Sequence, residues 1–259
     1  MVGRPTVGRT FSGSHRVRLG DCSPGGRLRL DAAARYLQDL SDDDTRDAGL
    51  AQMTWVVRRT VIDVLQFPTY LEPLDMVTWC SGLGSRWAER RVDLRSAGAG
   101  GGVGSISSAT LWVHLHSETL RPVPPGSEFR DVFSPSTQGR TISSRLSHAG
   151  PPPGLDVRPW HARFADFDVM NHMNNAIAFV MVEEMLARRR DLRAPLRVEV
   201  EYRSSVDPDV ALRFGGIDFI AGAAGHDGHD GHEGWLVDDQ DRCLIAFRVS
   251  RPPPPSVDA

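Results

Sequence analysis

The sequence contains no lysine, and its 30 arginines are its only permanently cationic side chains. This absence excludes catalysis through a lysine Schiff base and phosphate capture by a P-loop, because both need the lysine amine. Long apolar runs are absent too. No stretch reaches the roughly 18 apolar residues of a membrane span, so none is expected. The net charge of −3 gives no overall attraction to nucleic acid or to an anionic membrane surface.

Cysteine is scarce. Cys22, Cys80 and Cys243 are widely spaced and odd in number. This usage is typical of reduced thiols, and not of a disulfide framework or a metal-binding cluster. The first residues, MVGRPTVGRTFSG, lack the apolar core of a signal peptide. We therefore expect a cytoplasmic protein.

The richest polar stretch is WHARFADFDVMNHMNNAIAFVMVEE, which runs from Trp160 to Glu184. Within ten residues it holds six side chains that ionise or form hydrogen bonds: Asp166, Asp168, Asn171, His172, Asn174 and Asn175. The segment that follows is apolar on every side, which predicts a buried helix with Asn174 as its N-cap. Polar groups at the mouth of such a helix are costly unless they are paired or used. The pattern predicts an active-site loop at the positive end of a helix, where an oxyanion can be held.

The two halves of the chain share one plan. A shift of 145 residues aligns RLGDCS at 18–23 with RFADFD at 163–168, and Arg58 with Arg203. A helix is predicted after each of the two stretches, at Leu30–Leu40 with Asp31 as N-cap and at Asn175–Arg189. The alignment predicts an internal duplication.

Strand-like stretches follow each predicted helix. They are Trp55–Val64, Met76–Leu83, Trp87–Leu94 and Ile106–His116 in the first half, and Arg197–Ser205, Val210–Ile220, Trp235–Val237 and Cys243–Val249 in the second. The order predicts an α+β fold in which a mostly antiparallel sheet wraps around a helix in each half.

Four segments have the composition of loops. The glycine-rich run 98–104 is predicted to be a hairpin loop, and residues 252–259 a disordered tail. The Pro-, Gly- and Ser-rich segment 122–157 is predicted to cross between the halves without forming a compact element. GHDGHDGHE at 225–233 is predicted to be a flexible loop; its imidazoles and carboxylates could bind zinc or nickel only adventitiously.

The motif Asp168-x-x-x-His172-x-Asn174-Asn175, with Glu184 twelve residues after the histidine, resembles the active-site signature of the hotdog-fold acyl-ACP thioesterases of plants and bacteria. Further stretches resemble the first half of that family: WVV at 55–57, TWCSG at 78–82, RWAER at 86–90, LWV at 111–113 and ETLRPV at 118–123. The resemblance covers most of residues 15–250. It implies two tandem hotdog units, at 1–121 and 158–251, whose helices lie on one curved sheet.

The resemblance also implies the reaction. The expected function is hydrolysis of a fatty acyl-ACP thioester in fatty acid biosynthesis, without a cofactor or a metal. Asp168 would activate water or attack as a nucleophile, and His172 would carry the proton. Asn171 and Glu184 complete the expected catalytic set. The residues expected to contact substrate are Asn174, Asn175, Phe179, Trp55 and Trp79.

Two positions depart from the family pattern. Met170 stands where the family has an asparagine, and Ser205 where it has a catalytic glutamate. Three of the expected catalytic residues also have a purely structural alternative. Asp168 could cap the turn, and His172 could be a structural histidine. Glu184 could form an ion pair with Arg188. In the first half Ser23 and Arg27 align with Asp168 and His172, so one site per chain is expected, with the first half shaping an acyl tunnel.

The resemblance also suggests the partner. Acyl carrier proteins are acidic, so their enzyme is expected to have a basic rim, here formed by Arg158, Arg163, Arg188, Arg189 and Arg190. Two alternatives remain open: an acyl-CoA thioesterase, and a non-catalytic protein that binds acyl thioesters. A hotdog dehydratase also needs one histidine and one carboxylate, but the linear match to thioesterases argues against it. One chain with two hotdog units could act as a monomer or as a homodimer.

Overall fold

The strand-like segments of both halves form one ten-stranded antiparallel sheet. The computed structural model describes residues 2–97, 104–189, 191–219 and 230–252. The strands are β1 (Phe11–Arg16), β2 (Thr54–Gln66), β3 (Pro73–Leu83), β4 (Trp87–Ser96), β5 (Ser105–Leu115), β6 (Arg158–Trp160), β7 (Leu196–Tyr202), β8 (Leu212–Phe219), β9 (Gly231–Val237) and β10 (Cys243–Ser250). The helices are α1 (Leu30–Asp47), α2 (Ser127–Thr137) and α3 (Ala178–Arg188), with 3₁₀ turns η1 (Leu19–Asp21), η2 (Phe164–Asp166) and η3 (Asn175–Ile177).

The order of the strands reflects the duplication. It reads β1-β3-β4-β5-β2-β7-β10-β9-β8-β6, so each strand of one half has a counterpart at the mirrored place in the other. The turns η1 and η2 begin 145 residues apart, at Leu19 and Phe164. The α+β fold and the repeat in the sequence are therefore confirmed.

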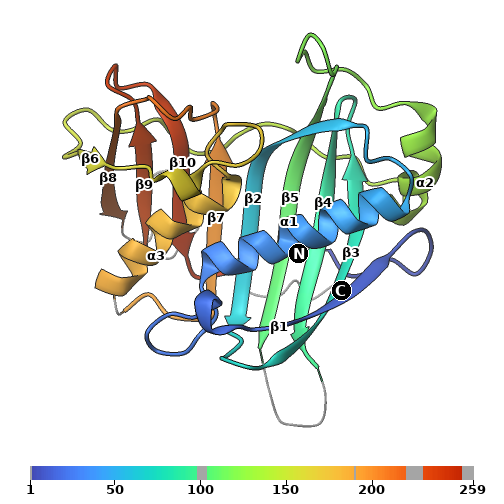
Figure 1. Cartoon of the computed structure of the whole chain (residues 1–259), viewed down its shortest axis with the longest axis horizontal. Coiled ribbons are helices and arrows are strands. Elements are labelled where there is room, and N and C mark those ends of the chain that lie inside the picture. The colour runs from blue at the N-terminus through green and yellow to red at the C-terminus, as the bar shows by residue number, and fades with distance from the viewer. Residues whose placement is uncertain (1, 98–103, 190, 220–229, 253–259) are drawn as a thin grey trace.

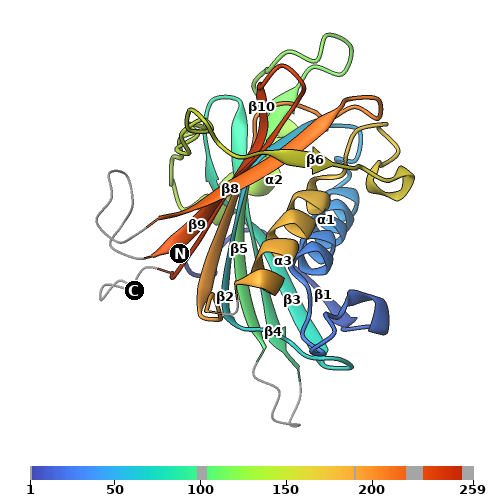
Figure 2. The ribbon, with the colours of Figure 1, turned by 90° about the vertical axis from the view of Figure 1, so that its left-hand side faces the viewer.

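The halves join where β2 pairs with β7, in a register that places Arg59 opposite Glu201. Both α1 and α3 lie across the same face of the sheet (Figure 1). Figure 2 shows the two helices side by side on that face, with the sheet curving around them. Within the described ranges no helix is long and apolar enough to span a membrane.

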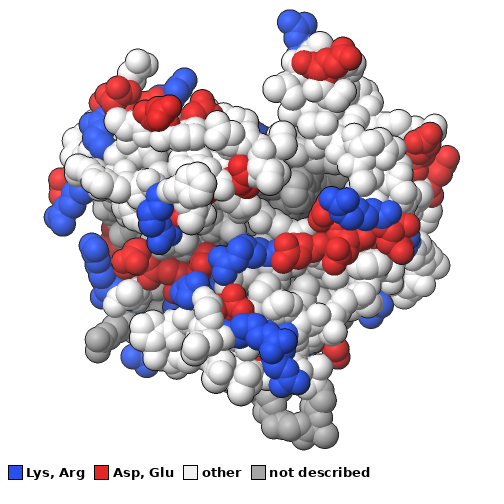
Figure 3. Space-filling model, viewed as in Figure 1, with Lys and Arg blue, Asp and Glu red and all other residues white. Residues whose placement is uncertain are grey.

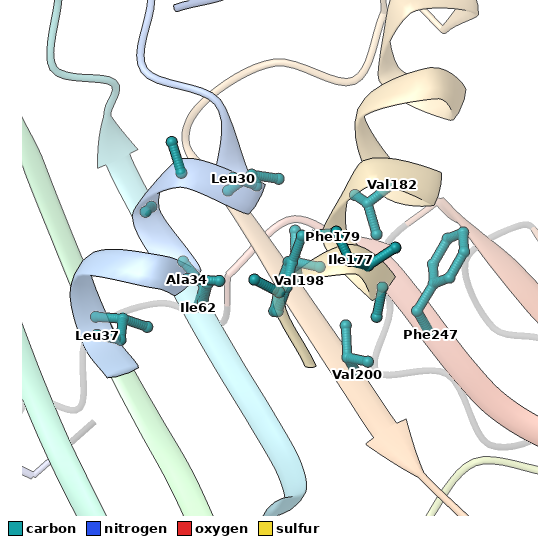
Figure 4. Packing of buried hydrophobic residues seen from close by; sticks show 14 of the residues in the cluster. Leu30, Ala34, Leu37, Ile62, Ile177, Phe179, Val182, Val198, Val200 and Phe247 are labelled. Atoms are coloured by element: carbon teal, nitrogen blue, oxygen red, sulfur yellow. The ribbon is translucent and has the colours of Figure 1, made fainter. Parts of the chain in front are cut away.

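One apolar core runs across the junction. Its members come from α1, η3, α3, β2, β7 and β10, and Figure 4 shows them between the helices and the sheet: Leu30, Ala34, Leu37, Ile62, Ile177, Phe179, Val182, Val198, Val200 and Phe247. Burial of each large aliphatic or aromatic side chain stabilises the fold by about 1.5–3 kcal/mol. The helices are thus fixed on the sheet, and with them the loop that precedes η3.

Two predictions about the helices are wrong. Asp31 is not an N-cap: α1 begins after Arg29, and the N–H of Leu30 donates to the Glu183 carboxylate at 2.7 Å. Glu183 also accepts two hydrogen bonds from Arg27, so α3 of one half caps α1 of the other. In addition α1 continues to Asp47, because the polar turn after Leu40 is held by buried ion pairs.

The crossover contains a compact element, contrary to the prediction. Helix α2 packs Phe129 and Phe133 against Cys80 and Leu50 in a second, smaller core. The apolar residues recur at helical spacing here, but Pro135 and the prolines before Gly126 concealed the pattern.

The run 225–233 is a loop only in part. Gly231–Glu233 belongs to β9, where His232 Nδ1 lies 2.7 Å from an Asp218 carboxylate oxygen and Glu233 pairs with Arg248. Residues 225–229 of that run, the glycine-rich residues 98–103 and the tail 253–259 lie outside the described residues.

Candidate active site

The predicted active-site loop is a tight turn from Asp168 to His172. The N–H of Asp168 donates to the carbonyl of His172 at 3.0 Å, and the N–H of Asn171 donates to the carbonyl of Asp168 at 2.9 Å. Asn171 has a left-handed φ of 57°, which asparagine tolerates better than most residues. Val169 and Met170 are exposed at the tip of the turn. The hydrogen bonds of the turn therefore fix the backbone positions of Asp168 and His172 relative to each other.

The first half repeats this turn 145 residues earlier. The N–H of Ser23 donates to the carbonyl of Arg27 at 2.8 Å, and the N–H of Gly26 donates to the carbonyl of Ser23 at 2.9 Å. Gly26 takes the left-handed position with a φ of 80°. The two turns share one backbone, but the first lacks both the carboxylate and the imidazole.

The Asp168 carboxylate is held from both sides. One oxygen accepts the Met170 N–H at 2.9 Å, and the other accepts the side-chain amide of Asn174 at 3.3 Å. Asn174 also accepts the Ala176 N–H at 2.9 Å, so it is the N-cap of η3, as predicted. One asparagine thus ties the carboxylate to the start of the buried helix.

His172 pairs with a carboxylate outside the turn. Its Nε2 lies 3.4 Å from a carboxylate oxygen of Asp207, and no hydrogen bond to the Asp168 side chain occurs among the described residues. Asp207 lies in the loop after β7, which is bound to the turn through the Met173 N–H and the carbonyl of Val206 at 2.8 Å. Asp207 was not predicted as a site residue, although it lies only two residues after Ser205.

The structure does not bring Glu184 to this turn. It lies ten residues after the N-cap Asn174, about 15 Å along a helix axis. Its side chain is exposed, and the predicted ion pair with Arg188 is not formed. The half-buried, paired glutamate of α3 is its neighbour Glu183.

A cavity lies behind the turn, between the two halves. It is lined by α1, β2 and β5 of the first half and by η3, α3 and β7 of the second; the residues are Ala34, Leu37, Gln38, Ser41, Val57, Thr60, Thr110, Trp112, Asn175, Ala176, Phe179 and Tyr202. Its volume of about 20 Å³ holds little more than one water molecule, so an acyl chain must displace side chains to enter. Figure 3 shows a hollow in the surface above the row of charged side chains along α1.

Two predicted substrate contacts, Asn175 and Phe179, line this cavity. Tyr202 donates its hydroxyl to the Asn175 carbonyl at 2.8 Å, which fixes the first residue of η3. Burial raises the pKa of Tyr202, so the phenol remains a neutral donor near neutral pH. The cavity is thus joined to the Asp168 turn through two consecutive asparagines.

Sequence profiles of the acyl-ACP thioesterase N-terminal and C-terminal domains match residues 8–133 and 155–216. The chain belongs to the acyl-ACP thioesterase family. An uncharacterized protein of Mycobacterium tuberculosis is 31% identical over 208 residues, which cover 80% of this chain and 82% of that protein.

Solved structures of acyl-ACP thioesterases share the fold. The 12:0-ACP thioesterase from Umbellularia californica superposes with a TM-score of 0.72 at 18% identity, over 94% of this chain and 98% of that one. An acyl-ACP thioesterase from Bacteroides thetaiotaomicron gives 0.74 at 15% identity, over 93% and 97%. These likenesses establish the fold, which is the predicted pair of hotdog units.

Two tryptophans expected to contact substrate in this thioesterase-family chain do not line the cavity. Trp55 packs its ring 4.9 Å from that of Phe129, in the smaller core beside α2. Trp79 follows Thr78 on β3. Thr78 accepts a hydrogen bond from Arg90, which also pairs with Asp44 of α1, so Thr78 faces the helices. Because neighbouring strand residues face opposite sides, Trp79 points away from the helices.

Three of the five arginines proposed to face an acyl carrier protein are paired with carboxylates. Arg158 lies 3.6 Å from Asp156, Arg163 2.8 Å from Asp166 and Arg189 2.7 Å from Asp191. Arg188 is exposed, and Arg190 lies outside the described residues. Figure 3 shows acidic side chains gathered along α1, so an acidic partner is disfavoured on that helix.

The cysteines of this acyl-ACP thioesterase family member are poor nucleophiles. Burial raises the pKa of Cys80 to about 11 and also raises the pKa values of Cys22 and Cys243. The thiolate is the reactive form, so none of the three is activated near neutral pH.

We therefore expect a triple Cys22→Ser, Cys80→Ala, Cys243→Ser variant to keep its activity. In a thiol-release assay its kcat should stay within about threefold of wild type, which is less than 1 kcal/mol in the barrier. A loss of a hundredfold or more, with the circular dichroism spectrum unchanged, would instead assign the chemistry to a cysteine.

Proposed function

We propose that this protein hydrolyses fatty acyl-ACP thioesters and releases the free fatty acid in fatty acid biosynthesis. The observation that carries the proposal is the Asp168 carboxylate, which Asn174 ties to the N-terminus of η3 beside a cavity between the two halves. Family membership supports the reaction class, and the 12:0-ACP thioesterase among the structural relatives supports the carrier.

The groups around the turn can divide the chemistry. In one route Asp168 takes a proton from the attacking water, and the C–S bond then breaks to give the fatty acid and the thiolate. In the other route Asp168 attacks the carbonyl carbon itself, the C–S bond breaks, and water then hydrolyses the acyl-aspartate anhydride to release the fatty acid. His172 gives a proton to the leaving thiolate. The N–H of Asn175, the first residue of η3, has no acceptor in the described part of the chain and lies at the positive end of the helix. This donor can stabilise the oxyanion.

The test is thiol release from acyl-ACP and acyl-CoA substrates that carry the same acyl chain. We expect turnover on both, with the higher kcat/KM on acyl-ACP. A higher kcat/KM on acyl-CoA would favour the acyl-CoA thioesterase alternative.

A non-catalytic acyl-binding protein is the second candidate. Met170 is exposed where the family has an asparagine, and Asp168 accepts the Met170 N–H as an ordinary turn cap does. This candidate predicts saturable binding of acyl-ACP, measured by fluorescence anisotropy, with no thiol release.

Asp207 is expected to act through His172, as a positioning residue. An Asp207→Asn variant should lower kcat about tenfold and leave KM nearly unchanged, because the carboxylate orients the imidazole without touching substrate. Asp209→Asn is the matched control, since Asp209 is an exposed aspartate of the same loop. Equal kcat values for the two variants would remove Asp207 from the mechanism.

The cavity is expected to receive the acyl chain. Leu37→Phe narrows it from the α1 side and should lower kcat/KM for a sixteen-carbon chain at least tenfold more than for an eight-carbon chain. Leu65→Phe places the same change at an exposed position of β2 and serves as control. An unchanged chain-length profile in both variants would place the acyl chain elsewhere.

A further inference from the structure

A second polar cluster lies on the face of the sheet opposite the helices. Glu199 and Glu201 are two residues apart on β7, so their side chains lie on the same face. Val200, between them, packs into the core on the helix side (Figure 4). The crossover passes over these two glutamates at Ser147 and His148. The cluster is therefore separated by the sheet from the Asp168 turn and the cavity.

His148 is buried there without a hydrogen-bond partner. Its side chain is 2% exposed, and neither Nδ1 nor Nε2 has a partner among the residues that the structure describes. Its Nε2 lies 3.8 Å from a Glu199 oxygen, which is too long for a hydrogen bond. An unpaired buried donor or acceptor costs about 1–3 kcal/mol. One ligand atom from each of His148, Glu199 and Glu201 lies within 4.8 Å of the others.

The surrounding contacts hold these groups in place. Glu201 is fully buried and accepts the backbone N–H groups of Ser147 and His148. The carbonyl of His148 accepts from Arg203, and the next carbonyl accepts from the Trp235 indole at 3.1 Å. Hydrogen bonds of this kind orient the ligands of a metal before it binds.

We propose that His148, Glu199 and Glu201 bind one divalent ion of the zinc class. One imidazole and two carboxylates are ligands that zinc prefers, and a water molecule can complete the tetrahedron. Small side-chain movements bring the ligand atoms to the roughly 2.0–2.2 Å bond lengths of zinc. Arg203 and Arg59 lie 3.4 and 4.0 Å from the two glutamates and weaken the attraction, so binding is expected to be moderate. The ion would link the crossover to β7.

The alternative is a metal-free ion pair between a protonated His148 and the two carboxylates. Zinc binding at this cluster distinguishes the two arrangements, because an imidazolium cannot ligate a metal.

The experiment uses the full chain. His226 and His229, of the run 225–233, could bind zinc themselves, so a His226→Ser, His229→Ser background is used throughout. Into it are placed His148→Asn, Glu199→Gln and, as control, His161→Asn at an exposed histidine. Zinc chloride is titrated by calorimetry, cobalt chloride by visible absorption, and Tm is measured with and without zinc.

We expect one zinc ion per background chain and a Tm that rises with zinc concentration. His148→Asn and Glu199→Gln should each raise Kd at least tenfold and abolish the rise in Tm, while His161→Asn changes neither. Glu199 is partly exposed, so its variant keeps the test valid if His148→Asn fails to fold. No saturable binding below 100 μM zinc, or an equal Kd in all variants, would overturn the proposal.

Discussion

Replacing Asp168 with asparagine is expected to lower kcat/KM for acyl-ACP by about 10²–10⁴, the range of general base catalysis. The asparagine keeps the side-chain volume and can keep the hydrogen bond from Met170, so the turn should fold unchanged. What it removes is the negative charge that accepts a proton from water or attacks the thioester. Thiol release measures the effect, and near-UV circular dichroism verifies the fold.

The matched control for this variant lies in the same chain. Ser23 occupies the same backbone turn 145 residues earlier, with the same two hydrogen bonds. Ser23→Ala should leave kcat/KM within about twofold of wild type. Equal activity of the Asp168 variant and the Ser23 variant would place the reaction outside this turn.

Replacing Asp44 with alanine is expected to destabilise the protein by about 3–5 kcal/mol, the cost of removing one partner of a buried ion pair and leaving the other unpaired. The Asp44 side chain is 1% exposed, lies 2.7 Å from Arg9 and also contacts Arg90. Its loss leaves two guanidinium groups without their shared carboxylate, one of them buried. Urea denaturation followed by circular dichroism measures the change.

The control for Asp44 is Asp42→Ala on the same helix. Asp42 pairs with Arg46 at 2.7 Å, but both side chains are more than half exposed. Exposed pairs contribute about 0–1 kcal/mol, so this variant should unfold almost as wild type does. Similar losses in both variants would mean that burial of the Asp44 pair is not what holds the end of α1.

Much of the fold could be predicted from local patterns, because each half repeats the same local signals. The offset of 145 residues aligned both turns and the helices α1 and α3 that follow them, and strand-like stretches located eight of the strands. The short strands β1 and β6 were missed, since three to six residues give little alternation. Helix α2 was missed because prolines hid its apolar spacing, and the cap of α1 because Glu183 comes from the other half.

The candidate site was predictable only within one continuous stretch. Asp168, Asn174 and Asn175 lie together because they are neighbours in sequence, and the capping role of Asn174 follows from its residue type. Asp207 reaches His172 from a loop 35 residues later, a contact that depends on how β7 lies beside the turn. The face of the sheet that Trp79 occupies depends on the register of β3, which spacing alone did not fix.

The most direct test of the central claim is to follow the fate of an acyl-ACP incubated with the wild-type protein in ¹⁸O-labelled water. Hydrolysis predicts free fatty acid that carries the label and free carrier thiol in equal amounts, over many turnovers. Both products are measured by mass spectrometry. Acyl-ACP that stays intact, bound one to one and without labelled acid, would contradict the claim and identify a binding protein.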